Sequence, residues 1–111
     1  MVKLIMHGCN GAMGQVISKI VEETEGAVMA AGIDRADEGK NDYPVFTDIN
    51  ACDVEADAII DFSAAPAVDG LLDFAVARQI PVVLCTTGLS EAQLQKVDEA
   101  SKKVAILRSA N

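Results

Sequence analysis

Three glycines near the N-terminus have the residue type and spacing of a phosphate-binding turn. Gly8, Gly11 and Gly14 lie between an apolar run and an amphipathic run, in the stretch HGCNGAMG. Glycine lets backbone N–H groups approach an anion closely, and the N-terminus of a following helix adds free donors and a positive dipole end. The spacing is G-x-x-G-x-x-G, not the more familiar G-x-G-x-x-G, so the turn alone could also be a plain connection between a strand and a helix. The neighbouring residues have to decide between the two interpretations.

An acid and an arginine stand side by side at the end of the next apolar run. Asp34 follows Gly14 by about twenty residues, the separation found in dinucleotide sites. A carboxylate at that place accepts hydrogen bonds from both ribose hydroxyls, because its two oxygens match a vicinal diol. Arg35 could stack on adenine or pair with a 2′-phosphate, or could be an ordinary solvated arginine. The pair predicts that both NADH and NADPH are accepted.

Hydroxyl side chains end two later apolar runs. Ser63 follows one of them, and Thr86-Thr87-Gly88 follows another. They could offer hydroxyl and backbone groups to the nicotinamide half of a dinucleotide, and they could equally be helix caps and turn residues.

Other reactive residue types do not form a convincing catalytic set. His7 has no carboxylate near it in sequence to orient its ring, so we interpret it as a packing residue, and we expect Cys9 to present only its backbone. The acids Asp53, Glu55 and Asp57 are typical of a solvated loop and not of a metal site. No catalytic residue and no metal ligand are predicted.

These residues must be positioned by alternating strands and helices. Apolar runs predict strands over 2–6, 27–33, 58–63, 81–85 and 104–107, with a short edge strand over 44–47 and a loop over 36–43. Helical periodicity predicts a helix over 15–21, with an apolar stripe that comprises Met13, Val16, Ile17, Ile20 and Val21. A second helix is predicted from Pro66, with a buried face that comprises Val68, Leu71, Leu72, Ala75 and Val76. A third is predicted from the capping box Ser90–Gln93 to about residue 103. Short connections between them predict a doubly wound, Rossmann-like parallel sheet in three α/β/α layers, as a single domain over 1–111.

Composition excludes several classes of partner. With 17 acidic and 9 basic side chains, the formal net charge is −8, which repels nucleic acid and anionic membrane surfaces. No apolar run approaches the roughly 18 residues of a membrane span. The three cysteines lack C-x-x-C pairs, so we expect free thiols and a soluble protein of the reducing cytoplasm.

Five segments together resemble a known enzyme family. They are HGCNGAMG at 7–14, GIDR at 32–35, IDFS at 60–63, CTTGLS at 85–90 and SAN at 109–111. In this order and spacing, the whole chain resembles bacterial 4-hydroxy-tetrahydrodipicolinate reductase, also called dihydrodipicolinate reductase. The resemblance implies an oxidoreductase that transfers hydride from NADH or NADPH to a cyclic precursor in the pathway to diaminopimelate and lysine.

The resemblance also implies a set of cofactor-binding residues. In the family the glycine turn holds the pyrophosphate, the acid and arginine contact the adenosine ribose or its phosphate, and the two later segments border the nicotinamide. Carried over to this chain, the set comprises Gly8, Cys9, Asn10, Gly11, Ala12, Met13, Asp34, Arg35, Ser63, Cys85, Thr86, Thr87, Ser109, Ala110 and Asn111.

The chain departs from the family pattern in three ways. Ala12 stands where many members carry a basic residue, which weakens a strict NADPH preference, and Cys85 replaces the first glycine of G-T-T-G. The histidine-rich E-x-H-H-x-x-K segment of the family's substrate domain is absent from these 111 residues. We therefore expect a cofactor domain that binds nucleotide without turnover, as a monomer or weak dimer, while the full-length enzyme would be a homotetramer.

Two other functions remain open from the sequence. The same fold could serve as a nucleotide-sensing or redox-sensing module that regulates a partner, or its glycine turn could bind nothing. The residues that follow Asn111 in the source reading frame would discriminate the reductase from the sensor.

Overall fold

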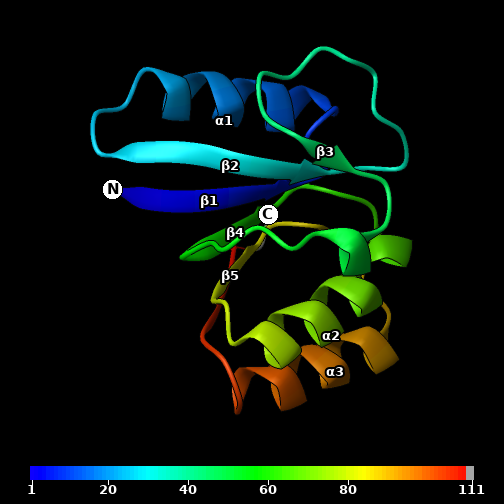
Figure 1. Ribbon diagram of the computed structural model, residues 1–111. Helices are drawn as coiled ribbons and strands as arrows, with labels where there is room; N and C mark the ends of the chain where they lie inside the picture. Colours follow the sequence, from blue (N-terminus) through cyan, green and yellow to red (C-terminus); the bar gives the residue numbers. More distant parts are fainter. Residues whose placement is uncertain (110–111) are drawn as a thin grey trace.

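A single six-stranded sheet organises the protein. The computed structural model describes residues 1–109. All strands are parallel, in the order β3-β2-β1-β4-β5-β6 (Figure 1). Their bounds are β1 Val2–His7, β2 Ala27–Ile33, β3 Val45–Phe46, β4 Ala58–Asp61, β5 Val82–Leu84 and β6 Ile106–Arg108.

Helices lie on both faces of this sheet and complete a three-layer fold. Helix α1, Ala12–Glu22, covers one face next to β1 and β2, while α2, Val68–Arg78, and α3, Glu91–Ser101, pack together on the other (Figure 1). The larger apolar core lies between the sheet and α2 and α3, and a smaller one lies under α1. The predicted doubly wound α/β fold is confirmed.

Helix α1 begins and faces the sheet differently from the prediction. It starts at Ala12, three residues before the predicted start, and buries Gly14 and Val21. The predicted apolar stripe is only partly covered, because Met13, Val16 and Ile20 are 46%, 50% and 56% exposed. Gly14 lies against the backbone of the glycine turn, where a Cβ would meet the carbonyl oxygens of Gly8 and Cys9. One edge of the stripe, at Val21, is buried, and the other edge lies in solvent.

The helices on the opposite face follow the prediction more closely. Val68, Leu71, Leu72 and Ala75 of α2 are buried, and Val76 is half-buried. Pro66 lies in a short 3₁₀ turn, Ala65–Ala67, directly before α2. The predicted capping box at the start of α3 is present, with the Ser90 hydroxyl accepting from the Gln93 amide and the Gln93 side chain accepting from the Ser90 amide.

Several predicted bounds were wrong by a few residues. Strand β4 ends at Asp61 and not at residue 63, β5 loses a residue at each end, and β6 is displaced toward the C-terminus of the predicted run at 104–107. Val104 is nevertheless buried, because it packs as a core residue before the strand begins. A 3₁₀ turn, Ile49–Ala51, was not predicted; the Asp48 side chain caps it by accepting from the Asn50 amide.

Two of the three cysteines lie in the apolar cores, and the acids of the loop before β4 lie at the surface. Cys9, Cys52 and Cys85 are free thiols, and Asp53, Glu55 and Asp57 are exposed. Within residues 1–109, no group of acidic, histidine and cysteine side chains is arranged to hold a metal ion. Over the same residues, every helix is too short or too polar to cross a membrane.

Candidate functional site

A groove of about 720 Å³ runs across the C-terminal ends of β1, β2 and β4. This is the edge of an open α/β sheet at which ligands bind. Its walls are the glycine turn after β1, the segment after β2, the start of the 3₁₀ turn at residues 49–51 and the loop that leads into α2. Six residues of the predicted set line it: Gly8, Asn10, Gly11, Asp34, Arg35 and Ser63.

The three glycines of the turn serve different purposes. Gly8 has φ +88°, and a Cβ there would lie 2.2 Å from the Phe62 carbonyl oxygen. A Cβ on Gly14 would lie 2.3 Å from the Gly8 carbonyl oxygen. Gly11 is exposed, and the nearest atom to a Cβ there is 3.6 Å away. Two glycines therefore permit tight packing of the turn, and the third leaves its outer surface open.

The open surface of the turn coincides with the start of α1. Gly11 is the N-cap residue and makes no side-chain cap, and the first turn of the helix carries no acid. Uncapped N–H groups and the positive end of the helix dipole attract an anion at such a terminus. Ala12 and Met13 lie there, exposed at the rim. The turn has the physical properties of a phosphate cradle.

Asp34 ties the glycine turn to the end of β2. Its Oδ2 accepts from the Asn10 amide at 2.9 Å, and its Oδ1 accepts from the Arg35 amide at 2.8 Å. Each carboxylate oxygen can accept a further hydrogen bond, and the residue lines the groove. The Arg35 side chain is exposed beside it. The predicted acid and arginine therefore share one wall with the turn.

Cys9 has a packing position behind the turn. It is fully buried, and its Sγ and Cβ lie against Gly32, where a Cβ would be 2.7 Å and 2.9 Å from them. Burial and, next, the charge of Asp34 raise the pKa of the thiol to about 11. The side chain therefore stays a protonated thiol near neutrality. The backbone of Cys9 bonds within the protein: its amide donates to the Ile33 carbonyl oxygen at 3.4 Å, and its carbonyl oxygen accepts from Gln15 Nε2.

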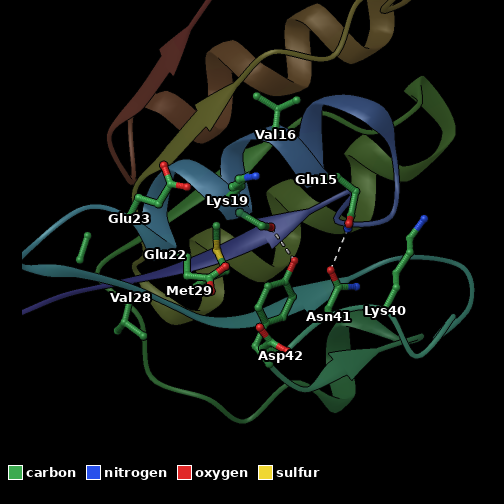
Figure 2. Close-up of a pocket in the computed structure, with 13 residues that line it drawn as sticks. Gln15, Val16, Lys19, Glu22, Glu23, Val28, Met29, Lys40, Asn41 and Asp42 are labelled. Atoms are coloured by element: carbon green, nitrogen blue, oxygen red, sulfur yellow. Dashed lines mark hydrogen bonds between the residues drawn. The ribbon is translucent and has the colours of Figure 1, made fainter.

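The loop over 36–43 supports the turn through contacts that sequence reasoning missed. Lys40 Nζ donates to the Asn10 carbonyl oxygen at 3.0 Å. Gln15 Nε2 donates to the Cys9 carbonyl oxygen at 2.8 Å and to Asn41 Oδ1 at 2.8 Å, the last of which is drawn in Figure 2. A second groove, of about 860 Å³, lies on this side between α1, the first half of β2 and the loop (Figure 2). No local pattern in the sequence signals these contacts.

A buried polar cluster lies beneath the candidate groove. Asp61 is fully buried. Its Oδ1 accepts from Ser63 Oγ at 2.6 Å and lies 2.7 Å from His7 Nδ1, while its Oδ2 accepts from Thr86 Oγ1 at 2.5 Å. Burial opposes ionisation of this carboxyl, but the hydrogen bonds from His7, Ser63 and Thr86 outweigh it and lower its pKa. Asp61 is therefore a carboxylate at neutral pH.

This cluster corrects the argument made about His7. The ring is buried, as expected for a packing residue, but a carboxylate does orient it. The partner is 54 residues away in the chain, and parallel pairing of β1 with β4 aligns His7 with Asp61. A search for acids close in sequence could not find it.

Four further predicted residues lie outside the lining of the groove, at or just after the ends of β5 and β6: Cys85, Thr86, Thr87 and Ser109. Thr86 is buried in the Asp61 cluster and Thr87 is exposed. The Cys85 amide donates to the Asp61 carbonyl oxygen at 3.0 Å, and the Ser109 amide donates to the Leu84 carbonyl oxygen at 3.0 Å. Burial and, next, the charge of Asp61 raise the pKa of Cys85. Ala110 and Asn111 lie outside the described residues.

Comparison with solved structures gives the fold. The chain superimposes with a TM-score of 0.77 on a dipicolinate-bound dihydrodipicolinate reductase from Paenisporosarcina sp. TG-14, at 22% identity over 91% of this chain and 43% of that one. An oxidoreductase from Agrobacterium radiobacter in complex with NAD⁺ gives a TM-score of 0.72, at 17% identity over 96% of this chain and 34% of the other. At these identities the similarity shows the fold alone.

Comparison of sequences shows the family. Similar curated proteins include the 4-hydroxy-tetrahydrodipicolinate reductases of Clostridium novyi, at 48% identity, and Caldanaerobacter subterraneus, at 47%. Each match covers 100% of this chain and 44% of the relative, so the chain spans less than half the length of these enzymes. The family model described as dihydrodipicolinate reductase, N-terminus, matches residues 2–111. The chain therefore belongs to the family of N-terminal domains of dihydrodipicolinate reductase.

Proposed function

We propose that this domain binds NADH or NADPH and presents it for reduction of 4-hydroxy-tetrahydrodipicolinate, a cyclic precursor of diaminopimelate and lysine. The observation that carries the proposal is the convergence of an uncapped helix N-terminus, an open glycine turn and Asp34 on one groove. These are the features that bind a pyrophosphate and a ribose diol. The names of the relatives supply the reaction.

Each group of residues has a role in this proposal. The turn from Gly8 to Met13 would hold the pyrophosphate, and Asp34 with Arg35 would hold the adenosine ribose, free or phosphorylated. The geometry fits this assignment, because Gly11 has no neighbour that would block a close anion and Asp34 lines the groove. When bound, the nicotinamide cofactor supplies the hydride. Ser63 and the strand ends that carry Cys85, Thr86, Thr87 and Ser109 would border the nicotinamide half, together with Ala110 and Asn111.

The absence of a strict cofactor preference is part of the proposal. Asp34 favours a free ribose diol, while Arg35 next to it offers a cation to a 2′-phosphate. Ala12 adds no charge at the rim of the turn. We infer that both cofactors bind with comparable affinity.

The partner of this domain would be the remaining part of the reductase, which binds substrate. That assignment rests on the coverage of 44% of the relatives by this chain. The 111-residue chain by itself would be a monomer or weak dimer, and the whole enzyme would be a homotetramer. The protein would be located in the cytoplasm.

Titration calorimetry of the 111-residue chain with NADH and NADPH tests the proposal. Binding of either nucleotide below millimolar concentration, without oxidation of NADH when substrate is added, is the expected result. Failure to bind both up to millimolar concentration would refute cofactor binding. Turnover by this chain alone would refute the need for a partner domain.

A further inference from the structure

His7 lies at the bottom of the candidate groove. It belongs to the lining of the groove together with Gly8, Gly11 and Ser63. Its side chain is nearly buried, and Asp61 holds its Nδ1 at 2.7 Å. The ring therefore has a fixed orientation beside the turn assigned above to the pyrophosphate.

The two ring nitrogens of His7 have different surroundings. Nδ1 faces the Asp61 carboxylate, and a carboxylate can only accept, so Nδ1 carries the proton. Over residues 1–109, Nε2 makes no hydrogen bond to the protein. Every completely buried side-chain nitrogen and oxygen among these residues does have a partner, so Nε2 is not completely buried. Nε2 is therefore the nitrogen that solvent or a ligand in the groove can reach. In neutral histidine it accepts a hydrogen bond, and in the imidazolium it donates one.

The charged groups around the ring are mostly acidic. Asp61 on β4 contacts it directly, and the groove is also lined by Asp34, Glu38 and Asp48, with Arg35 as the other cation. Thr86 of β5 adds only a hydroxyl and an amide to the cluster, and α1 brings no acid in its first turn. A buried carboxylate stabilises an imidazolium, and a pyrophosphate in the groove would add further negative charge.

We propose that His7, oriented by Asp61, binds the pyrophosphate of the cofactor through Nε2 as an imidazolium, so that nucleotide binding is accompanied by proton uptake. The inference rests on the proposed function, since it adds a ligand to the same site. It assigns a binding role to a residue that the glycine pattern does not include. Affinity for NADH then increases as the pH falls.

Two variants remove the ionisable ring of His7. His7→Asn retains an amide N–H that can donate to Asp61, as Nδ1 does, but has nothing at the position of Nε2. His7→Gln places an uncharged amide near the position of Nε2. Thermal unfolding followed by circular dichroism identifies the variant that keeps the fold, and either one suffices for the comparison.

Calorimetric titration with NADH at pH 6, 7 and 8, in buffers of different ionisation enthalpy, tests the proposal. The pyrophosphate of NADH stays ionised over this range, and NADH lacks the titrating 2′-phosphate of NADPH. The wild-type chain should bind about tenfold more tightly at pH 6 than at pH 8 and take up a fraction of a proton. Both variants should bind with a flat pH profile and without proton uptake.

The outcomes distinguish this inference from the proposed function. Binding by the wild-type chain without proton uptake, or an unchanged pH profile in His7→Asn, would overturn the role of His7 and leave cofactor binding intact. Absence of NADH binding by the wild-type chain would overturn both.

Discussion

At the scale of single residues, Asp34 combines a structural role with the ribose-binding role proposed above. Its carboxylate accepts from the amides of Asn10 and Arg35 and so fixes the glycine turn against the end of β2. Each of these oxygens can accept a further hydrogen bond, and Asp34 lines the groove. A change at Asp34 should therefore alter nucleotide preference as well as the order of the turn.

Asp34→Asn should weaken NADH binding about tenfold, because an amide offers one acceptor where the ribose diol needs two. The affinity for NADPH should fall less, because the substitution also removes the repulsion between the carboxylate and the 2′-phosphate. Parallel calorimetric titrations with both nucleotides measure the ratio of NADH to NADPH affinity. Asp37→Asn is the matched control, because Asp37 lies close by in the chain and accepts a local hydrogen bond from the Gly39 amide. An unchanged ratio of NADH to NADPH affinity in Asp34→Asn would contradict the assignment.

Asp61 should make the stability of the fold sensitive to acid. Hydrogen bonds lower its pKa in the folded state despite burial, below the value of about 3.9 for aspartate in an unfolded chain. Its contribution to stability is therefore complete above about pH 4 and is lost as the pH falls through the lowered folded-state pKa. Urea unfolding of the wild-type chain between pH 7 and pH 3 should show this loss.

Asp61→Asn should lower the free energy of unfolding at pH 7 by about 1–3 kcal/mol, because an amide N–H₂ would face groups that donate to Asp61. The variant should also lose less stability than the wild type on acidification. Asp73→Asn is the control, since its ion pair with Lys96 is on the surface and contributes little. Equal acid sensitivity of the wild type and Asp61→Asn would refute this account.

The limits of sequence reasoning are clear at this scale. The order of glycines, acid and arginine is local enough to predict one wall of the groove. The contact between His7 and Asp61 depends on strand pairing across 54 residues, which no local spacing encodes. The contact of Lys40 with the Asn10 carbonyl similarly depends on how the loop over 36–43 folds back.

At the scale of elements, the two glycines inside helices differ in how closely other atoms pack against them. Gly14 of α1 touches the turn so closely that a Cβ would lie 2.3 Å from the Gly8 carbonyl oxygen. Gly70 of α2 has only the Ile49 Cγ2 atom at 4.0 Å from such a Cβ. Both positions weaken the intrinsic helix propensity, but only the first gains close packing in return.

Gly14→Ala should destabilise the domain by about 1–3 kcal/mol, because its methyl group would push the backbone of the turn away from α1. Gly70→Ala should stabilise it by about 0.5–1 kcal/mol through lower chain entropy in the unfolded state. Urea unfolding of both variants gives the comparison. A stabilised Gly14→Ala variant would show that the turn does not need the close approach seen here.

The elements themselves were predictable where periodicity and caps coincide. Ser90 with Gln93 marked the start of α3, and the apolar run at 27–33 matched β2 without error. The face of α1 was predicted less well, because its apolar stripe is wider than the surface that the sheet offers it. Strand register and helix rotation are set by packing between elements, so the sequence of a single segment does not predict them.

At the scale of the whole molecule, charge and exposed apolar surface oppose each other. The net charge of −8 favours separation of the molecules. Val16 and Ile20 on α1 and Leu107 on β6 are 50%, 56% and 67% exposed, which favours association.

We expect a monomer at micromolar concentration in low salt and a weak tendency to dimerise as salt screens the charge. Sedimentation velocity at increasing salt concentration measures the fraction of dimer. Val16→Lys with Ile20→Lys should abolish the dimer, while Lys19→Glu on the same helix should not promote one. A stable tetramer of this 111-residue chain at low salt would contradict the expectation.

The central claim is that the groove across the ends of β1, β2 and β4 binds the cofactor. Titration of the ¹⁵N-labelled chain with NADH, followed by NMR, tests it most directly. Binding in this groove should shift the amide signals of the glycine turn from Gly8 to Met13, together with those of Asp34, Arg35 and Ser63. Shifts confined to the second groove, at Glu22, Val28 and Asp42, or the absence of any shift at millimolar NADH, would contradict it.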